Sequence, residues 1–435
     1  MPTAEVRSLL DYIDSSPSPY HAVGTTVSRL EAAGFTALDR REAWPQGPGR
    51  RYVADGGAVV AWADASGAPA APCRIVGAHT DSPNLRVKAR PDTGRAGWRQ
   101  LGVEVYGGAL VNSWLDRDLG LSGRLTVSDS TGPNGVRTLL VRIDRPILRV
   151  PQLAIHLDRE INEKGLQLNK QVHLSPVLGT GVPREGELVE MVAAEAGVSP
   201  TAVLAWDLML HDVVPGTIGG VDDDLVFAPR LDNLFSCHVG VEALVQAADR
   251  AEETGDGPTP VLCLFDHEEV GSSTATGAAG TLLGQVLELA EHARGGDRST
   301  LLRSLGGSVC ASADMAHATH PNYPERHEPD HHIQLNGGPV VKINANQRYA
   351  SDAESTAAFV LACDQVEVAH QRYIHRTDMA CGSTIGPMTA AGLAIPTVDV
   401  GVAQLSMHSI RELTGALDVA PMTAALGAFL SPRLS

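Results

Sequence analysis

The sequence predicts an α/β protein whose helix-covered sheet is interrupted by a β-rich block. Segments at both ends of the chain alternate between helical and extended apolar patterns, which is typical of strands connected by helices. The middle, from about Asp92 to Gly220, instead holds short strands separated by glycine and proline turns. The 435 residues exceed one domain of about 150 residues. We therefore predict one domain over 1–92 and 221–435 and an inserted domain over 93–220.

The elements follow from local patterns. Apolar runs that break into polar residues predict strands at Arg74–Ala78, Val261–Phe265, Ser308–Ala311, Val340–Asn344 and Pro396–Val400, and in the inserted block at Val103–Tyr106, Gly123–Val127 and Arg137–Ile143. Apolar residues at helical spacing predict helices at Glu5–Ile13, Ala22–Ala33, Asn233–Ala248, Gly280–His292, Glu354–Cys363 and Met422–Leu430. The polar stretches Asp249–Gly257 and Gly295–Ser299 are predicted as loops.

Composition excludes several classes of partner. With 34 basic and 51 acidic residues the net charge is −17, which repels phosphate backbones and anionic lipid surfaces. Aromatic residues are 4%, so few side chains could stack on single strands. No apolar run approaches the roughly 18 residues of a membrane span, and the first residues show no signal-peptide pattern. We expect no nucleic-acid or membrane partner.

The six cysteines are scattered and form no C-x-x-C pair. Most stand among apolar neighbours, which is typical of buried thiols in a reducing compartment. The expected location is cytoplasmic.

Residues with metal-binding side chains follow the predicted strands or begin a helix. In open α/β sheets functional groups gather at the carboxyl ends of strands. In chain order the candidates are His79, Asp81, Asp232, Glu268, Glu269, Asp314 and His408. Imidazole and carboxylate donors together favour zinc, cobalt or manganese. An alternative is that these are ordinary solvated loop residues.

The number of donors indicates two metals. Two histidines, two aspartates and one glutamate make five protein ligands, which are too many for one open catalytic zinc, since that takes three. They fit two ions about 3.5–4 Å apart with one bridging carboxylate. Neighbouring residues on extended chain point in opposite directions, so Glu268 and Glu269 are not expected to bind the same ion. One of them can bind metal while the other acts as general base.

Five motifs spaced along the chain resemble one family. They are Gly77-Ala78-His79-Thr80-Asp81-Ser82-Pro83, Arg230-Leu231-Asp232-Asn233, Glu268-Glu269-Val270-Gly271-Ser272, Ser312-Ala313-Asp314-Met315-Ala316-His317 and Met407-His408-Ser409-Ile410-Arg411-Glu412. In this order they resemble the aspartyl aminopeptidases, the M18 family of dizinc metallopeptidases. The match begins at Ser15–His21 and extends to the C-terminal helix, with no departure at a catalytic position.

The resemblance implies a fold and a ligand set. The fold is an α/β/α sandwich peptidase domain interrupted by an inserted β-rich dimerisation domain, assembled as a homododecamer. One metal would be held by His79 and Asp314, the other by Glu269 and His408, with Asp232 bridging. Glu268 would be the general base, and Asp81 would orient His79.

Three other residues receive roles through the resemblance, and the role of a fourth, His317, stays open. Lys342 would meet the acidic side chain of the substrate, although a lysine inside a strand usually faces solvent. Tyr349 would contact substrate; alternatively it is a half-buried core tyrosine. His156 would stabilise the oxyanion beside the metals of a neighbouring subunit, whereas by itself it would be a core histidine. His317 could face substrate or support a ligand.

The resulting prediction is a cytoplasmic dinuclear aminopeptidase that removes N-terminal Asp or Glu from peptides. The ions are expected to be Zn²⁺, with Co²⁺ or Mn²⁺ as alternatives. Glu268 would take a proton from the attacking water and deliver it to the departing amine. The alternatives are an aminopeptidase of this family with another N-terminal preference and a non-catalytic shell protein of the same fold.

Overall fold

A computed structural model of the chain describes residues 4–64, 66–255 and 257–433. The chain divides into two compact units. The first unit holds Met1–Asp81, Gly216–Met407 and Glu412–Ser435, and the second holds Ser82–Pro215 together with His408–Arg411.

The first unit is built on a nine-stranded sheet. Its strands, in spatial order, are β1 (Thr36–Ala37), β2 (Gly49–Asp55), β3 (Ala58–Asp64), β13 (Thr259–Phe265), β4 (Cys73–His79), β14 (Val309–Ala313), β18 (Thr397–Gly401), β16 (Val340–Ile343) and β17 (Gln371–Ile374). The central strands β13, β4, β14 and β18 are parallel to one another. Their carboxyl ends therefore meet at one edge of the sheet, where α/β proteins place their functional groups.

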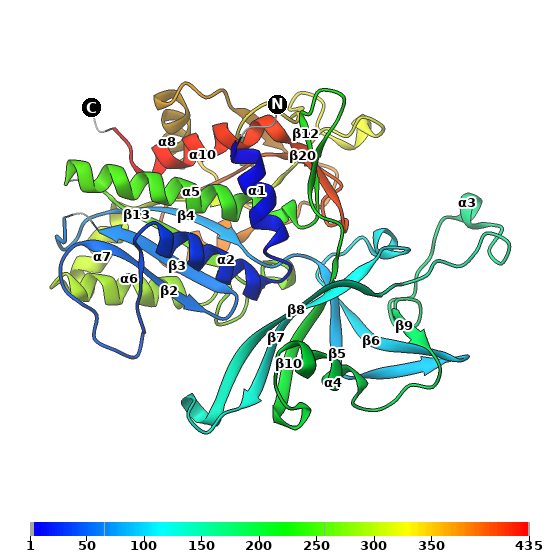
Figure 1. The fold of residues 1–435 in the computed structure, drawn as a ribbon. Coiled ribbons are helices and arrows are strands. Elements are labelled where there is room, and N and C mark those ends of the chain that lie inside the picture. Colours follow the sequence, from blue (N-terminus) through cyan, green and yellow to red (C-terminus); the bar gives the residue numbers. More distant parts are fainter. Residues whose placement is uncertain (1–3, 65, 256, 434–435) are drawn as a thin grey trace. The chain divides into compact units, whose positions relative to one another are not determined.

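Helices cover both faces of this sheet (Figure 1). The first face carries α1 (Ala4–Asp14), α2 (Pro19–Ala32), α5 (Leu231–Thr254), α8 (Ala353–Gln365) and α10 (Val419–Leu430). The second face carries α6 (Leu282–Ala293), α7 (Arg298–Gly306) and α9 (Ile385–Leu393). Alternate residues of β4 supply the two cores, Val76 and Ala78 to one and Ile75 to the other. The α/β class predicted from the sequence is confirmed.

A second, five-stranded sheet also belongs to the first unit. It runs in the order β11 (Thr217–Gly219), β12 (Leu225–Ala228), β20 (Glu412–Gly415), β19 (Ala403–Leu405) and β15 (Ala316–His317). The sequence did not predict it, because its strands are only two to four residues long.

The second unit is a six-stranded sheet. Its strands are β8 (Val136–Leu148), β7 (Leu119–Ser128), β10 (Val203–Asp212), β5 (Asn84–Arg95), β6 (Trp98–Tyr106) and β9 (Val177–Thr180). The helix α4 (Glu187–Glu195) packs on its core, while the short α3 (Ile161–Lys164) lies in a segment that extends away from the sheet (Figure 1).

The joints between the units differ in place from the predicted boundaries. Strand β5 pairs with β6 and β10 of the second unit, so the first joint precedes it and lies before 92. The second joint lies at Pro215 and Gly216 rather than at 220. The return of 408–411 to the second unit was not predicted; Ile410 is buried in the core of that unit.

One loop prediction is wrong, and the other predicted loop, Gly295–Ser299, overlaps α7, which begins at Arg298. The stretch Asp249–Gly257 does not form a loop throughout, because α5 continues to Thr254 and ends at Gly255, which has a left-handed backbone. Asp249 and Glu252 on this last part of the helix both pair with Arg50, 2.7 Å away. The polar pattern there is an exposed helix face rather than a loop.

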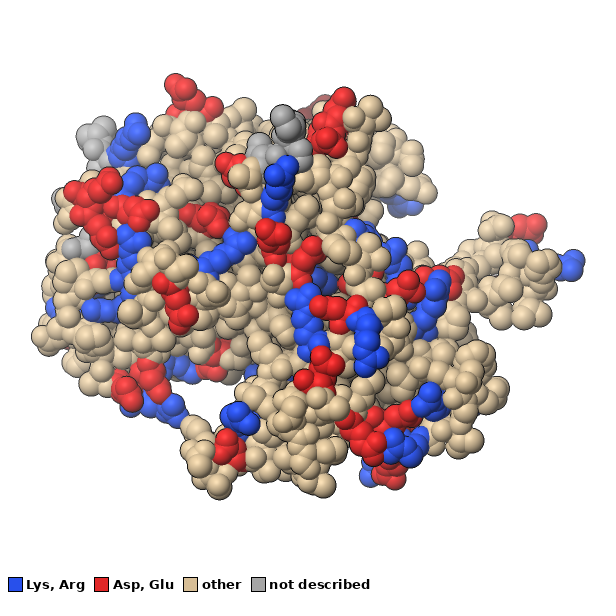
Figure 2. Space-filling view, in the orientation of Figure 1, with Lys and Arg blue, Asp and Glu red and all other residues tan. Residues whose placement is uncertain are grey.

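Acidic and basic side chains are interspersed on the visible surface (Figure 2). None of the helices within the described residues is both long and apolar enough to cross a membrane.

Candidate metal centre

His79 is the last residue of the buried central strand β4, and its side chain is 1% exposed. Its Nδ1 lies 3.0 Å from the main-chain oxygen of Asp81 and 3.4 Å from the Oδ1 of the same residue. These contacts orient the ring so that Nε2 faces carboxylates. Nε2 lies 3.3 Å from Asp232 Oδ1, 3.5 Å from Asp314 Oδ1 and 4.0 Å from Glu268 Oε2.

Asp81 also holds the loop that carries the two glutamates. The register of β4 and β13 places His79 opposite Phe265, so the chain leaving β13 passes directly beside it. The Asp81 carboxylate accepts hydrogen bonds from the main-chain N–H groups of Glu268 (3.0 Å) and Glu269 (3.1 Å). One buried aspartate thus orients the histidine and fixes the turn over 268–270.

Asp232 enters the site from the start of α5. Its main-chain N–H donates to Glu412 Oε2 at 3.0 Å. No role was predicted for Glu412; its position four residues after His408 within the same motif was the available signal. Asp314 follows β14, and its Oδ2 lies 3.3 Å from Lys342 Nζ.

His79, Asp232 and Glu269 form a group that could hold a metal ion, which we call the His79 cluster. Each offers one ligand atom, and these atoms lie within 4.8 Å of one another. Burial, and then the charge of Asp232, raises the pKa of Glu269 well above its usual value. Burial also raises the pKa of Glu268 to about 8. A bound cation would offset the repulsion between these buried carboxylates.

The protonation of His79 depends on the same carboxylates. Burial disfavours its charged form, but hydrogen bonds to Asp232, Asp314 and Asp81 outweigh burial and raise the pKa of His79 well above its usual value. A metal bound at Nε2 would take the place of this proton. One imidazole and several carboxylates around a buried point therefore fit a divalent cation of the zinc, cobalt or manganese type.

His408 belongs to the second unit. Its Nδ1 lies 3.2 Å from the main-chain oxygen of Gly108, and its main-chain oxygen accepts the N–H of Leu110 at 3.0 Å. A Cβ at position 108 would stand 2.9 Å from His408 Nδ1, so this contact requires glycine. A histidine that ligates metal commonly uses its second nitrogen in such a bond to a carbonyl.

Lys342 is fully enclosed, at 1% exposure. It lies on β16, between β18 and β17, and its burial shows that the alternative of a solvent-facing lysine is wrong. Its Nζ lies 3.2 Å from the main-chain oxygen of Met315 and 5.2 Å from the centre of the Tyr349 ring. Tyr349 is buried in a small core next to the site.

His317 lies on β15, with its ring 6.1 Å from that of Tyr373. Burial, and then the charge of Lys342, lowers the pKa of His317 to about 4, while the charges of Asp232 and Asp314 act in the opposite direction. Whether His317 contacts the substrate or supports a metal ligand stays open.

His156 lies in the second unit, in a segment over 151–173 that is almost entirely exposed. The alternative of a core histidine is therefore wrong. The same segment exposes apolar side chains on either side of His156, with Ile155 at 47% and Leu157 at 75% exposure.

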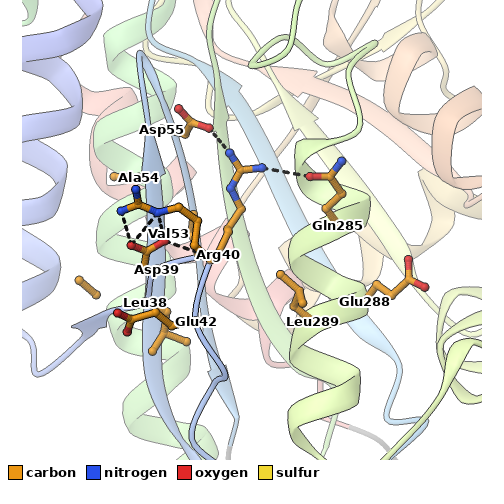
Figure 3. A pocket seen from close by; sticks show the side chains of 12 residues that line it. Leu38, Asp39, Arg40, Glu42, Val53, Ala54, Asp55, Gln285, Glu288 and Leu289 are labelled. Carbon is orange, nitrogen blue, oxygen red and sulfur yellow. Dashed lines mark hydrogen bonds and ion pairs between the residues drawn. The ribbon is translucent and has the colours of Figure 1, made fainter. Parts of the chain in front are cut away.

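A surface cavity of about 950 Å³ lies elsewhere on the first unit, between the β1–β2 region and α6 (Figure 3). Arg40 projects into it and bonds to Asp55 and to Gln285, the latter at 3.0 Å (Figure 3). None of the residues of the His79 cluster lines this cavity. Its arginine charge is already paired, so the cavity does not call for a ligand.

An imidazole–carboxylate cluster at the carboxyl ends of parallel strands fits a metal-dependent hydrolase. Residues 12–430 match the model of the family described as aminopeptidase I zinc metalloprotease (M18). The chain belongs to this M18 family and is an aminopeptidase.

Relatives and solved structures agree over the whole length. The "Probable M18 family aminopeptidase 2" of Streptomyces coelicolor is 53% identical over 427 residues, covering 98% of this chain and 97% of that protein. A structure described as the Ape4 and Nbr1 complex superposes with a TM-score of 0.93 at 34% identity, covering 98% of this chain and 85% of that chain. The S. cerevisiae mApe1 dodecamer gives a TM-score of 0.85 at 29% identity, with coverages of 98% and 96%.

Proposed function

We propose that the protein is a dinuclear zinc aminopeptidase that removes N-terminal Asp or Glu from peptides. The observation that carries the acidic preference is Lys342, a fully buried cation whose Nζ lies 3.3 Å from Asp314. With Asp314 engaged as a metal ligand, the buried ammonium would bind a substrate carboxylate, and an apolar substrate side chain would deny it that partner.

The ligand assignment follows the motifs and the donor geometry. His79 and Asp314 would hold one ion, and Glu269 and His408 would hold the other. Asp232 would be a ligand of both ions. The distances from His79 Nε2 to Asp232 and Asp314 support the first assignment, and the His408–Gly108 bond supports a ligand role for His408. When bound, the ions would supply a nucleophile at neutral pH and polarise the scissile carbonyl.

Glu268 is the proposed general base. Its carboxylate lies 4.0 Å from His79 Nε2 but is not a member of the His79 cluster. Its main chain is held by Asp81. Burial raises the pKa of Glu268 to about 8; two bound cations would lower the pKa again, so that the carboxylate could accept the proton of water and pass it to the departing amine.

His156 is proposed to act in the site of a neighbouring copy, where it would donate a hydrogen bond to the oxyanion. Its exposure, beside exposed Ile155 and Leu157, supports contact with a second chain. We propose self-association through the second unit and, by similarity to the dodecameric relative, a homododecamer. We also propose a cytoplasmic location, because all six cysteines are free thiols and free thiols are typical of a reducing compartment.

A panel of chromogenic aspartyl, glutamyl, lysyl and leucyl amides, assayed with and without a chelator, tests this function. Preferential hydrolysis of the two acidic substrates, abolished by the chelator and restored by Zn²⁺, supports the proposal. A preference for lysyl or leucyl amides would establish the family member with another specificity. No metal-dependent hydrolysis of any amide would favour the non-catalytic shell protein.

A further inference from the structure

Asp399 is a buried carboxylate of the nine-stranded sheet that has no part in the proposed chemistry. It lies on β18 and is 0% exposed. Its Oδ1 accepts hydrogen bonds from the hydroxyl groups of Ser312 (2.7 Å) and Thr384 (2.6 Å), and its Oδ2 accepts one from the main-chain N–H of Ala350 (2.6 Å). A buried carboxylate is costly unless such donors satisfy it. The donors come from three separate segments, so Asp399 joins these segments at one point.

The segment 349–351, which we call the Tyr349 loop, is attached to Asp399 at two points. Ala350 donates its main-chain N–H to the carboxylate, and the main-chain N–H of Asp399 donates to Ser351 Oγ at 2.9 Å. Both Ala350 and Ser351 are buried. Because Tyr349 directly precedes them in the chain, these two bonds fix the backbone of Tyr349 relative to β18.

Lys342 is the direct partner of Asp399 across the antiparallel pair of β16 and β18. Directly opposite residues project from the same face of a sheet, with Cβ atoms about 4.5–5.5 Å apart. Strand β18 lies between β16 and β14, and the Lys342 ammonium lies 3.3 Å from Asp314, which follows β14. The lysine side chain therefore crosses β18 on the face that carries Asp399, and it ends 5.2 Å from the centre of the Tyr349 ring.

The start of α9 packs closely against Asp399. Thr384 caps this helix, because its Oγ1 donates to Asp399 and accepts the main-chain N–H of Gly386 at 3.3 Å. A Cβ at position 386 would stand 2.3 Å from Asp399 Oδ2, so the approach of the helix requires glycine. A buried polar group whose hydrogen bonds are all made rigidifies its surroundings. Asp399 is therefore a fixed support for the Tyr349 loop.

The charge of Asp399 also bears on Lys342. Burial raises the pKa of Asp399, whereas the charge of Lys342, followed by the hydrogen bonds from Thr384 and Ser312, acts in the opposite direction. The attraction between the two charges is mutual. An ionised Asp399 would therefore offset part of the cost of burying the Lys342 ammonium.

We propose that Asp399 is a positioning residue for the acidic preference: it holds the Tyr349 loop beside the Lys342 ammonium, so that both side chains meet a substrate carboxylate together. A site whose parts are held in place before the ligand arrives loses less conformational entropy on binding. Leucyl substrates have no side-chain carboxylate for the ammonium, so they depend less on this arrangement. The inference rests on the proposed function and adds to it the residue that fixes the pocket around Lys342.

The test is the variant Asp399→Asn, which keeps the size of the side chain and removes its charge. The amide oxygen can still accept the two hydroxyl groups, but the amide nitrogen cannot accept the N–H of Ala350. The ratio of kcat/KM for aspartyl over leucyl amides should fall roughly 10-fold or more, mainly through a higher KM for the aspartyl amide, for the loss of one hydrogen bond to a charged group. Metal content should equal that of the wild type, because Asp399 is not a proposed ligand.

Asp418→Asn is the matched control. Asp418 is also fully buried, and its carboxylate accepts the main-chain N–H groups of Asn336 at 2.7 Å and Gly338 at 2.8 Å. None of these residues is assigned to the substrate or the metals. Both variants should lower the thermal midpoint of unfolding, because each breaks buried hydrogen bonds, but Asp418→Asn should keep the aspartyl-to-leucyl ratio of the wild type.

Ser351→Ala decides the question should Asp399→Asn fail to fold. It removes only the acceptor of the Asp399 N–H, so the ratio should fall roughly two- to fivefold, the effect of one neutral hydrogen bond.

Two outcomes would overturn the inference alone. They are an unchanged ratio in Asp399→Asn or, should that variant not fold, in Ser351→Ala, and a fall of the same size in Asp418→Asn. A wild type that hydrolyses leucyl amides as well as aspartyl amides would overturn the proposed acidic preference and this inference with it. The panel on the wild type therefore separates the two failures.

Discussion

Individual side chains at the carboxyl edge of the large sheet each serve more than one neighbour. Asp81 accepts from the main chain of Glu268 and Glu269 and also lies against His79 Nδ1. Such sharing couples the geometry of the proposed base to that of the proposed ligand. It also means that substitutions which keep size and remove one function are the informative ones.

Glu268→Gln should retain both metals and lose several orders of magnitude in kcat. The amide keeps the shape of the side chain but cannot accept the proton of water. Asp232→Ala should instead lose metal, because it removes a donor of the His79 cluster. Metal content measured by atomic absorption, alongside kcat, checks both; an emptied Glu268→Gln with a fully loaded Asp232→Ala would show that the roles are misassigned.

Lys342→Ala should lower kcat/KM for aspartyl substrates far more than for leucyl ones. The expected difference is roughly 2–4 kcal/mol, the cost of removing one member of a buried charge pair. The measurement is the ratio of kcat/KM for aspartyl and leucyl amides in the variant and the wild type. An equal fall for the two substrates would make Lys342 a structural residue that balances Asp314.

At the scale of elements, three helices of the first unit meet at one arginine. Arg29 of α2 bonds the main-chain oxygen of Ser8 on α1 at 2.8 Å and pairs with Glu242 on α5 at 2.9 Å. Its Nη1 also lies 2.8 Å from Nδ1 of buried His238 on α5. The histidine must therefore be neutral at Nδ1 to accept this bond.

This contact predicts an acid-sensitive stability. Burial, and then the charge of Arg29, lowers the pKa of His238 to about 3, whereas an unfolded histidine titrates near 6.5. Between these values the unfolded chain binds a proton that the folded chain does not. The stabilisation is thus present above about pH 6.5 and is lost as the pH falls, by up to about 1.4 kcal/mol per pH unit.

His238→Gln keeps an acceptor for Arg29 and removes the titration. Its free energy of unfolding, measured with urea from pH 7 to pH 4, should fall less steeply than that of the wild type. His292→Gln, at an exposed position of α6, is the control and should follow the wild-type curve. If His238→Gln and the wild type show the same pH dependence, the histidine is not the acid-sensitive group.

At the scale of the whole molecule, the exposed segment 151–173 bears on assembly. A chain that exposes Leu157 and Ile155 beside a histidine presents apolar surface suited to a second copy. A two-fold interface would exchange such segments reciprocally. Each active site would then combine metals and Glu268 from one chain with His156 from its partner.

Co-expression of two inactive variants tests this arrangement. His156→Phe should retain metal and lose roughly 10²–10³ in kcat, the cost of one oxyanion donor. Mixed with Glu268→Gln at equal expression, it should recover roughly a quarter of wild-type activity, because half of the dimers are mixed and each has one complete site. Glu268→Gln expressed alone is the control. Activity no higher than the average of the two separate variants would place His156 within its own site or outside catalysis.

The sequence by itself determined the class of fold and the residues of the His79 cluster. Apolar periodicity is local, so it indicated β4, β13 and β14 and the polar residues that follow them, and parallel strands bring such residues to one edge. The motifs then assigned Glu268 and His408, which spacing alone left open.

Only the tertiary structure decided which surroundings these residues have. Lys342 is buried because Asp314, Met315 and Tyr349 from other segments enclose its ammonium group, although its own segment does not distinguish a buried lysine from an exposed one. His408 is held by the second unit through Gly108, which lies 300 positions away in the chain. Local sequence fixes the direction in which a side chain leaves its strand, whereas burial and partnership depend on packing between distant segments.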